Sequence, residues 1–134
     1  MSRPASHALD RLPRQTVRHL KDIAPSGLRD WVSASAQTLI EVNLEGCTDK
    51  RSVLQAVARD FTFPSWFGMN LDALYDALTD LPEQRPAAGY VILLEHLPRT
   101  DGFGADERAA LLDVFRDAAE SYAEQGIPFR VLYS

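Results

Sequence analysis

Cysteine is almost absent from this sequence: Cys47 is the only one, so no internal disulfide can form. A chain without disulfides fits a reducing compartment. The sequence also has no apolar run of about eighteen residues, the length a membrane-spanning helix needs, and no apolar segment of the signal-peptide kind near its N-terminus. We therefore expect a cytoplasmic protein without membrane contact. No histidine lies near Cys47 in sequence, which favours a small structural residue over a nucleophile.

Patterns that carry catalysis or hold a cofactor are missing as well. The three histidines, His7, His19 and His96, have the spacing of neither a metal pair nor a catalytic triad. The glycines form neither a GxGxxG nor a P-loop pattern. Asp72 and Asp76 resemble an acid–base pair or a hard-cation ligand pair, but acid–base work needs carboxyl groups in different environments, which a solvated helix face does not supply. We predict no catalytic residue, no metal site and no cofactor, and a small enzyme has little support.

What the sequence does have is an uneven charge. Residues 1–36 hold six basic and three acidic residues, a net charge of +3, whereas residues 37–134 hold eight basic and sixteen acidic residues, a net charge of −8. An acidic domain is a poor match for nucleic acid, whose phosphates bind Lys and Arg. The same charge steers a basic protein into contact. We therefore expect a basic protein partner and no nucleic acid.

The first thirty-six residues form a segment distinct from the rest. Pro13 and the run at 24–27 interrupt a weak helical pattern, which predicts two short helices near 14–23 and 28–34, with Ser26 as the cap of the second. Two interpretations stay open: a flexible extension, or a basic segment that lies against the acidic body or meets a second partner. We divide the chain into this extension, 1–36, and one compact domain, 37–134.

Three apolar segments of the compact domain predict strands. Residues 38–44 and 129–133 have β-branched or aromatic content, and 90–94 is a continuous apolar run typical of a strand buried on both faces. Helical patterns lie between them, and strands joined by helices form parallel sheets. The predicted fold class is therefore α/β, with a three-stranded parallel sheet packed with helices and an N-terminal extension.

The helices are predicted from their apolar stripes and their termini. Thr48 or Asp49 caps the first, and Asp106 caps a long last helix that ends near Gly126. Residues 82–89, with two prolines and a glycine, are predicted as a connection. The stripes that face the core are Val53, Leu54, Val57 and Phe61 in the first helix, and Leu111, Phe115, Ala118 and Tyr122 in the last.

The middle helix carries the most unusual pattern. After the aromatic loop 63–68, four leucines fall on one face, and Asp72, Asp76 and Asp80 fall on the opposite face. Carboxylates spaced i, i+4, i+8 repel one another by about 0.2–0.5 kcal/mol for each neighbouring pair. Local stability does not explain them, and a cationic partner does. The alternative is an ordinary solvated helix face.

The run Trp66-Phe67-Gly68-Met69-Asn70-Leu71-Asp72-Ala73-Leu74-Tyr75-Asp76 resembles the signature of the barstar family, intracellular inhibitors of barnase-like guanyl-specific ribonucleases. The match holds in order and spacing over eleven consecutive positions, and the resemblance extends from about 37 to 134. It implies the α/β fold predicted above. It also implies an inhibitor whose loop and acidic helix plug a nuclease active site.

The resemblance assigns roles to particular residues. In the family, an acidic residue directly after a Val-Phe-Arg turn of the last helix reaches a basic residue of the nuclease. Val114-Phe115-Arg116-Asp117 matches this turn, so the resemblance makes Asp117 the corresponding residue, one methylene shorter than the family's usual glutamate. Gly68 is expected to let the loop approach closely and Asn70 to cap or brace it. The predicted partner-binding residues are Trp66, Phe67, Gly68, Asn70, Asp72, Tyr75, Asp76, Asp80 and Asp117.

The aromatic residues leave two alternatives open. Phe67 is expected mainly in the core, whereas Trp66 and Tyr75 fit the core and a binding surface about equally well. Tyr75 stands where the family commonly has tryptophan, and Trp66 where it commonly has tyrosine. The predicted partner is a basic, extracellular-type ribonuclease bound 1:1. The alternative is a protein of the same fold that acts as an immunity or interaction protein for a different basic toxin or partner.

Overall fold

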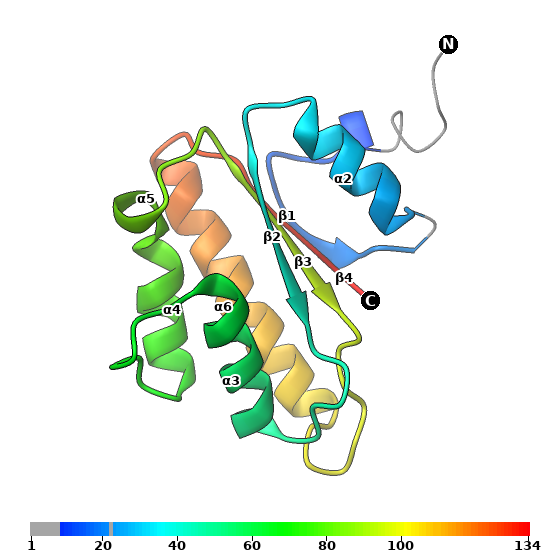
Figure 1. The fold of residues 1–134 in the computed structure, drawn as a ribbon, viewed down its shortest axis with the longest axis vertical. Coiled ribbons are helices and arrows are strands. Elements are labelled where there is room, and N and C mark those ends of the chain that lie inside the picture. Colours follow the sequence, from blue (N-terminus) through cyan, green and yellow to red (C-terminus); the bar gives the residue numbers. More distant parts are fainter. Residues whose placement is uncertain (1–8, 22) are drawn as a thin grey trace.

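The computed structural model describes residues 9–21 and 23–134, which form one parallel sheet with helices on both faces (Figure 1). The strand order is β1-β4-β3-β2, and all three neighbouring pairs are parallel. The predicted strands are present as β2 (Thr38–Asn43), β3 (Tyr90–Glu95) and β4 (Phe129–Tyr133). Residues 90–94 are all buried, as a continuous apolar run predicts for a strand covered on both faces.

A fourth strand corrects the prediction of a three-stranded sheet. The predicted helix at 14–23 is wrong, because β1 (Gln15–His19) occupies this segment and pairs with β4. Pro13 precedes β1, and the β-branched pair Thr16 and Val17 favours an extended backbone. The pairing joins positions more than a hundred residues apart in sequence, such as Gln15 and Phe129, so local pattern did not reveal it.

Among the residues that the structure describes, four helices cover one face of the sheet and α2 (Pro25–Ser33) lies on the other (Figure 1). The four are α3 (Lys50–Phe61), α4 (Leu71–Thr79), α5 (Leu81–Gln84) and α6 (Ala105–Glu124). The larger core lies beneath them, and the predicted stripes of α3 and α6 are buried in it. The smaller core lies under α2, where Leu28 and Val32 pack on Val91 and Leu93 of β3. Alternate side chains of β3 therefore pack into two separate cores, one on each face of the sheet.

Helix termini agree with the sequence in part. Asp49 caps α3 as predicted, and its carboxylate accepts a hydrogen bond of 2.8 Å from the backbone N–H of Ser52. The N-cap of α6 is Gly104 rather than Asp106, and that of α2 is Ala24 rather than Ser26, with Pro25 inside the first turn. The predicted connection at 82–89 begins with the last residues of α5, a single helical turn.

Part of the basic N-terminal segment lies against the acidic body. Arg29 of α2 forms an ion pair of 2.6 Å with Glu41 of β2. Arg130 of β4, whose pKa burial lowers, donates to the carbonyl of Pro13 at 3.0 Å and to Gln37 at 2.7 Å. The docked interpretation therefore describes residues 13–21 and 23–33 better than a flexible one. The domain boundary near 37 stays a prediction.

None of the helices within the described residues has both the length and the hydropathy that crossing a membrane requires.

Candidate functional site

Helix α4 is held in place at both ends. At its start the side-chain oxygen of Asn70 accepts a hydrogen bond of 2.7 Å from the N–H of Ala73, so Asn70 is the N-cap as predicted. Leu74 and Leu78 bury the inner face. Near its end the Tyr122 hydroxyl of α6 donates to the carbonyl of Leu78 at 2.5 Å, and burial raises the pKa of Tyr122 well above its usual range. The outer face, with Asp72 and Asp76, is thereby fixed in orientation.

The aromatic loop before α4 combines a buried anchor with an exposed aromatic. Phe67 is half-buried, and its ring centroid lies 5.0 Å from that of Phe63, which stacks in turn on Phe61 of the core. Trp66, beside it, is 80% exposed. A β-carbon on Gly68 would lie 3.3 Å from that of Ala73, so glycine allows the loop to close on the first turn of α4. The loop therefore presents Trp66 on a rigid base.

A groove runs between α4 and α6. It encloses about 630 Å³ and is lined by Leu71, Asp72, Tyr75, Asp76, Val114, Asp117, Glu120, Ser121 and Glu124. Three of the predicted carboxylates, Asp72, Asp76 and Asp117, thus come together from two helices. Two more, Glu120 and Glu124, join them, and none of the basic residues that the structure describes lines the groove. Tyr75, 36% exposed, lies among these carboxylates.

The groove carboxylates lack cationic partners within the described part of the chain. The ion pair nearest to them in sequence joins Arg116 to Asp113 at 2.9 Å, and neither of these residues lines the groove. Five like charges on two packed helices repel one another, and folding gains nothing from that arrangement. A bound cationic surface would remove the repulsion. The groove therefore has the charge of a site for a basic partner.

A second hollow flanks α4 on the side of the aromatic loop. It encloses about 100 Å³ and is lined by Pro64, Trp66, Phe67, Gly68, Ala73, Asp76, Ala77, Asp80 and Gln84. Asp80 therefore lies outside the groove, although the sequence placed it on the same helix face. Asp76 lines both this hollow and the groove between α4 and α6. It is the carboxylate that joins the aromatic loop to the acidic groove.

Glu120 and Glu124 are the groove residues that sequence reasoning missed. Neither is among the predicted partner-binding residues. They follow Asp117 by three and seven positions, so all three share one face of α6. The sequence shows that spacing, but it does not show which helix packs against this face. Asp113, on the same helix, is exposed and pairs with Arg116.

The carboxylates line the groove without converging on a point. No three His, Cys, Asp or Glu side chains among residues 9–21 and 23–134 are arranged to hold a metal ion. The expectation that the protein needs no metal or cofactor stays a prediction.

The structure is thus an α/β domain with an acidic groove between two fixed helices and exposed aromatics beside it. The family comparison makes the class more specific: the model described as Barstar (barnase inhibitor) matches residues 37–134. The match covers most of the chain, and the chain therefore belongs to the barstar family, as the run at 66–76 predicted. A comparison with curated proteins returned no match.

Proposed function

We propose that this protein inhibits a basic, barnase-type ribonuclease by covering its active site in a 1:1 complex. The observation that carries the proposal is the groove in which Asp72, Asp76 and Asp117 meet from two helices, with no cationic partner among residues 9–21 and 23–134. Membership of a family described as barnase inhibitors supports the same conclusion. The protein would act by binding, in the cytoplasm, and not as an enzyme.

The proposed mechanism is mimicry of RNA phosphate. A ribonuclease that cleaves RNA holds phosphate among cationic side chains, and carboxylates on a rigid helix can occupy the same positions without offering a bond to cleave. Asp76 is the proposed anchor because it lines both the acidic groove and the hollow beside the aromatic loop. Asp72 and Asp117 line the groove with it. The hydrogen bond from Tyr122 keeps α4 fixed, so little conformational entropy is lost on binding.

The two exposed aromatics complete the proposed surface. Trp66 lines the same hollow as Asp76 and Asp80, and Tyr75 lies in the acidic groove. Trp and Tyr are enriched among residues that dominate binding energy, where they exclude water from neighbouring polar contacts. Exclusion of water strengthens the ion pairs that the carboxylates form. Phe67, half-buried, is proposed to support Trp66 and to border the same hollow.

Inhibition should be tested by adding the protein in steps to a guanyl-specific ribonuclease while RNA cleavage is followed. Loss of cleavage that is complete at one equivalent supports the proposal. Cleavage that continues at the uninhibited rate with the protein in excess would contradict it.

Another basic toxin is the alternative partner. Glu120 and Glu124 favour it, because they extend the acidic groove beyond the positions that the family signature supplied. An immunity or interaction protein of this kind would bind a basic protein through the same groove and leave a guanyl-specific ribonuclease active. The cleavage assay therefore separates the two candidates.

A further inference from the structure

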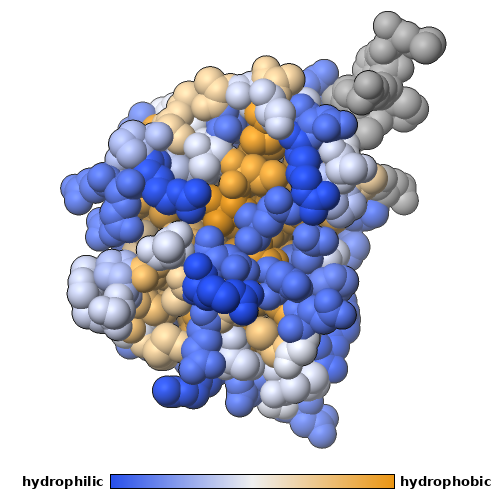
Figure 2. All heavy atoms as spheres, in the orientation of Figure 1, coloured by the Kyte–Doolittle hydropathy of each residue, from blue (hydrophilic) through white to orange (hydrophobic). Residues whose placement is uncertain are grey.

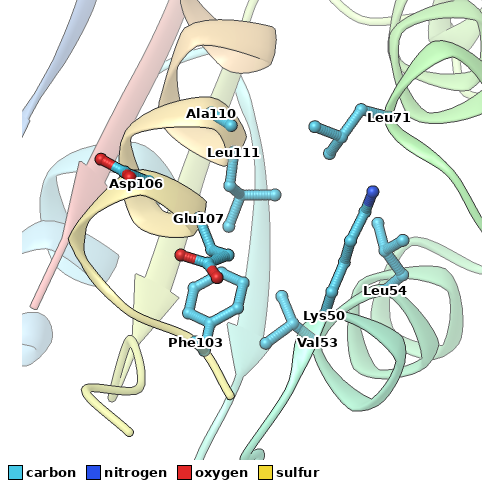
Figure 3. A pocket seen from close by; sticks show the side chains of 9 residues that line it. All are labelled: Lys50, Val53, Leu54, Leu71, Phe103, Asp106, Glu107, Ala110 and Leu111. Atoms are coloured by element: carbon cyan, nitrogen blue, oxygen red, sulfur yellow. The ribbon is translucent and has the colours of Figure 1, made fainter. Parts of the chain in front are cut away.

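An apolar hollow lies beside the acidic groove, between the first turns of α3 and α6 (Figure 3). Its walls include Val53 and Leu54 of α3, Leu71 of α4, and Phe103 and Leu111 at α6. All but Leu71 are at most 2% exposed, so these walls are the outer surface of the main core. The hollow is open, and in Figure 3 these side chains face one another across it.

The size of the hollow limits what it can hold. It encloses about 180 Å³. Sites for drug-sized ligands usually enclose about 300–1,000 Å³, which makes this one too small for such a molecule. A single apolar side chain fits better. Hot spots of protein interfaces are commonly formed by one such anchor in a pocket.

Charged residues surround the apolar floor. Lys50 rises from α3 on one side, and Asp106 and Glu107 lie on α6 on the other (Figure 3). Within the described residues none of the three takes part in an ion pair. An apolar centre with a polar rim is the usual anatomy of a protein interface. Figure 2, which shows the molecule from the same side as Figure 1, also has areas of apolar surface bordered by hydrophilic side chains.

The hollow and the acidic groove are adjacent. Leu71 lines both, and along α6 the lining passes from Glu107 and Ala110 in the hollow to Val114 and Asp117 in the groove. These positions follow one stripe of the helix. Ala110 and Asp117 are seven residues apart, a rise of about 10 Å along the axis. One protein that fills the groove therefore reaches the hollow without any change in either helix.

We propose that the hollow receives an apolar side chain of the same basic protein that occupies the acidic groove. This proposal rests on the proposed function and makes it more specific. The partner presents an apolar residue about 10 Å, measured along α6, from the cation that pairs with Asp117. The carboxylates then govern steering and salt dependence, and the apolar anchor governs how slowly the complex dissociates.

The test fills the hollow by enlarging a side chain that lines it. Ala110→Leu places a larger side chain in the hollow on a helix that tolerates leucine. Ala109→Leu is the matched control, because Ala109 is exposed and does not line the hollow. Binding of a barnase-type ribonuclease is measured for both variants and the original chain at two salt concentrations. Far-UV circular dichroism checks the fold, and Ala110→Met replaces Ala110→Leu if the latter is unfolded.

We expect the filled hollow to weaken binding at least tenfold, with the same salt dependence as the original chain, while Ala109→Leu stays within threefold. Equal affinity of the filled variant and the control would overturn the proposal and leave the proposed function intact. A dimer of the original chain that Ala110→Leu converts to a monomer would also overturn it, because a second copy would then be the occupant. Failure of the original chain to bind the ribonuclease would overturn the proposed function itself, and this proposal with it.

Discussion

The hydroxyl of Tyr122 in α6 donates to the carbonyl oxygen of Leu78 in α4 at 2.5 Å. In a continuing helix the N–H four positions after Leu78 would bond that carbonyl, but position 82 is a proline and has no N–H. Tyr122 therefore supplies from a neighbouring helix the donor that Pro82 removes. This bond ties together the two helices that carry the acidic groove.

Removing that hydroxyl should lower the stability of the protein. We predict that Tyr122→Phe lowers the free energy of unfolding by about 1–3 kcal/mol, the usual cost of leaving a buried polar group without its partner. Urea denaturation measures the change. Tyr133→Phe is the control, since the Tyr133 hydroxyl forms no hydrogen bond within the described residues. Equal midpoints for the two variants would show that the Tyr122 bond contributes nothing.

Trp66 should matter for binding and not for folding. Because its side chain is 80% exposed, we predict that Trp66→Ala changes the free energy of unfolding by no more than about 0.5 kcal/mol. Its affinity for the ribonuclease should fall by at least about 2 kcal/mol. Parallel urea denaturation and calorimetric titration check both parts. A variant that binds normally would remove Trp66 from the interface.

Glu120 and Glu124 should act through long-range charge. We predict that Glu120→Gln together with Glu124→Gln slows association with the ribonuclease several-fold at low salt and weakens the salt dependence of the rate. Stability should stay the same or rise slightly, because repulsion within the groove decreases. Stopped-flow kinetics measures the rates. Glu83→Gln with Glu45→Gln is a control of equal charge outside the groove, and an equal slowing in both pairs would mean that only net charge matters.

Asp60 should make stability depend on pH. The hydrogen bonds from the Arg59 guanidinium, together with one from the N–H of Asn43, hold the pKa of Asp60 below its usual range. A lowered folded-state pKa adds stability that is present above the ordinary aspartate pKa of about 3.9 and is lost as pH falls through the folded value. Asp60→Asn should therefore cost about 1 kcal/mol at pH 7, and this cost should shrink as pH falls below the ordinary aspartate pKa toward about 2. Urea denaturation at both pH values, with the exposed Asp101→Asn as the control, measures this difference.

The parts of the fold that local pattern determines were predictable. Leu74 and Leu78 are buried and Asp72 and Asp76 exposed because a period of 3.6 residues divides α4 into two faces. Asp49 caps α3 for an equally local reason. β1 was mistaken for a helix because its five residues are stabilised by pairing with β4 at the other end of the chain. Such non-local pairing leaves little trace in a single short segment.

In the candidate site, too, local pattern predicts some features and non-local packing determines the others. Exposure of Asp117, Glu120 and Glu124 follows from their spacing in α6, but their meeting with α4 depends on how the two helices pack. The family resemblance supplied Asp117 and not the two glutamates. Trp66 and Phe67, adjacent in sequence, differ in exposure because only Phe67 reaches the Phe63 ring. Composition alone could not assign one to the core and the other to the surface.

The central claim is that Asp76 anchors a basic ribonuclease in the acidic groove. Isothermal titration of the ribonuclease with the original chain, Asp76→Ala and Asp113→Ala tests it most directly, since both variants remove one carboxylate and only Asp76 lines the groove. We predict tight 1:1 binding that Asp76→Ala weakens by at least about 2 kcal/mol, while Asp113→Ala stays within about 0.5 kcal/mol of the original chain. A loss of less than about 0.5 kcal/mol for Asp76→Ala would contradict the claim.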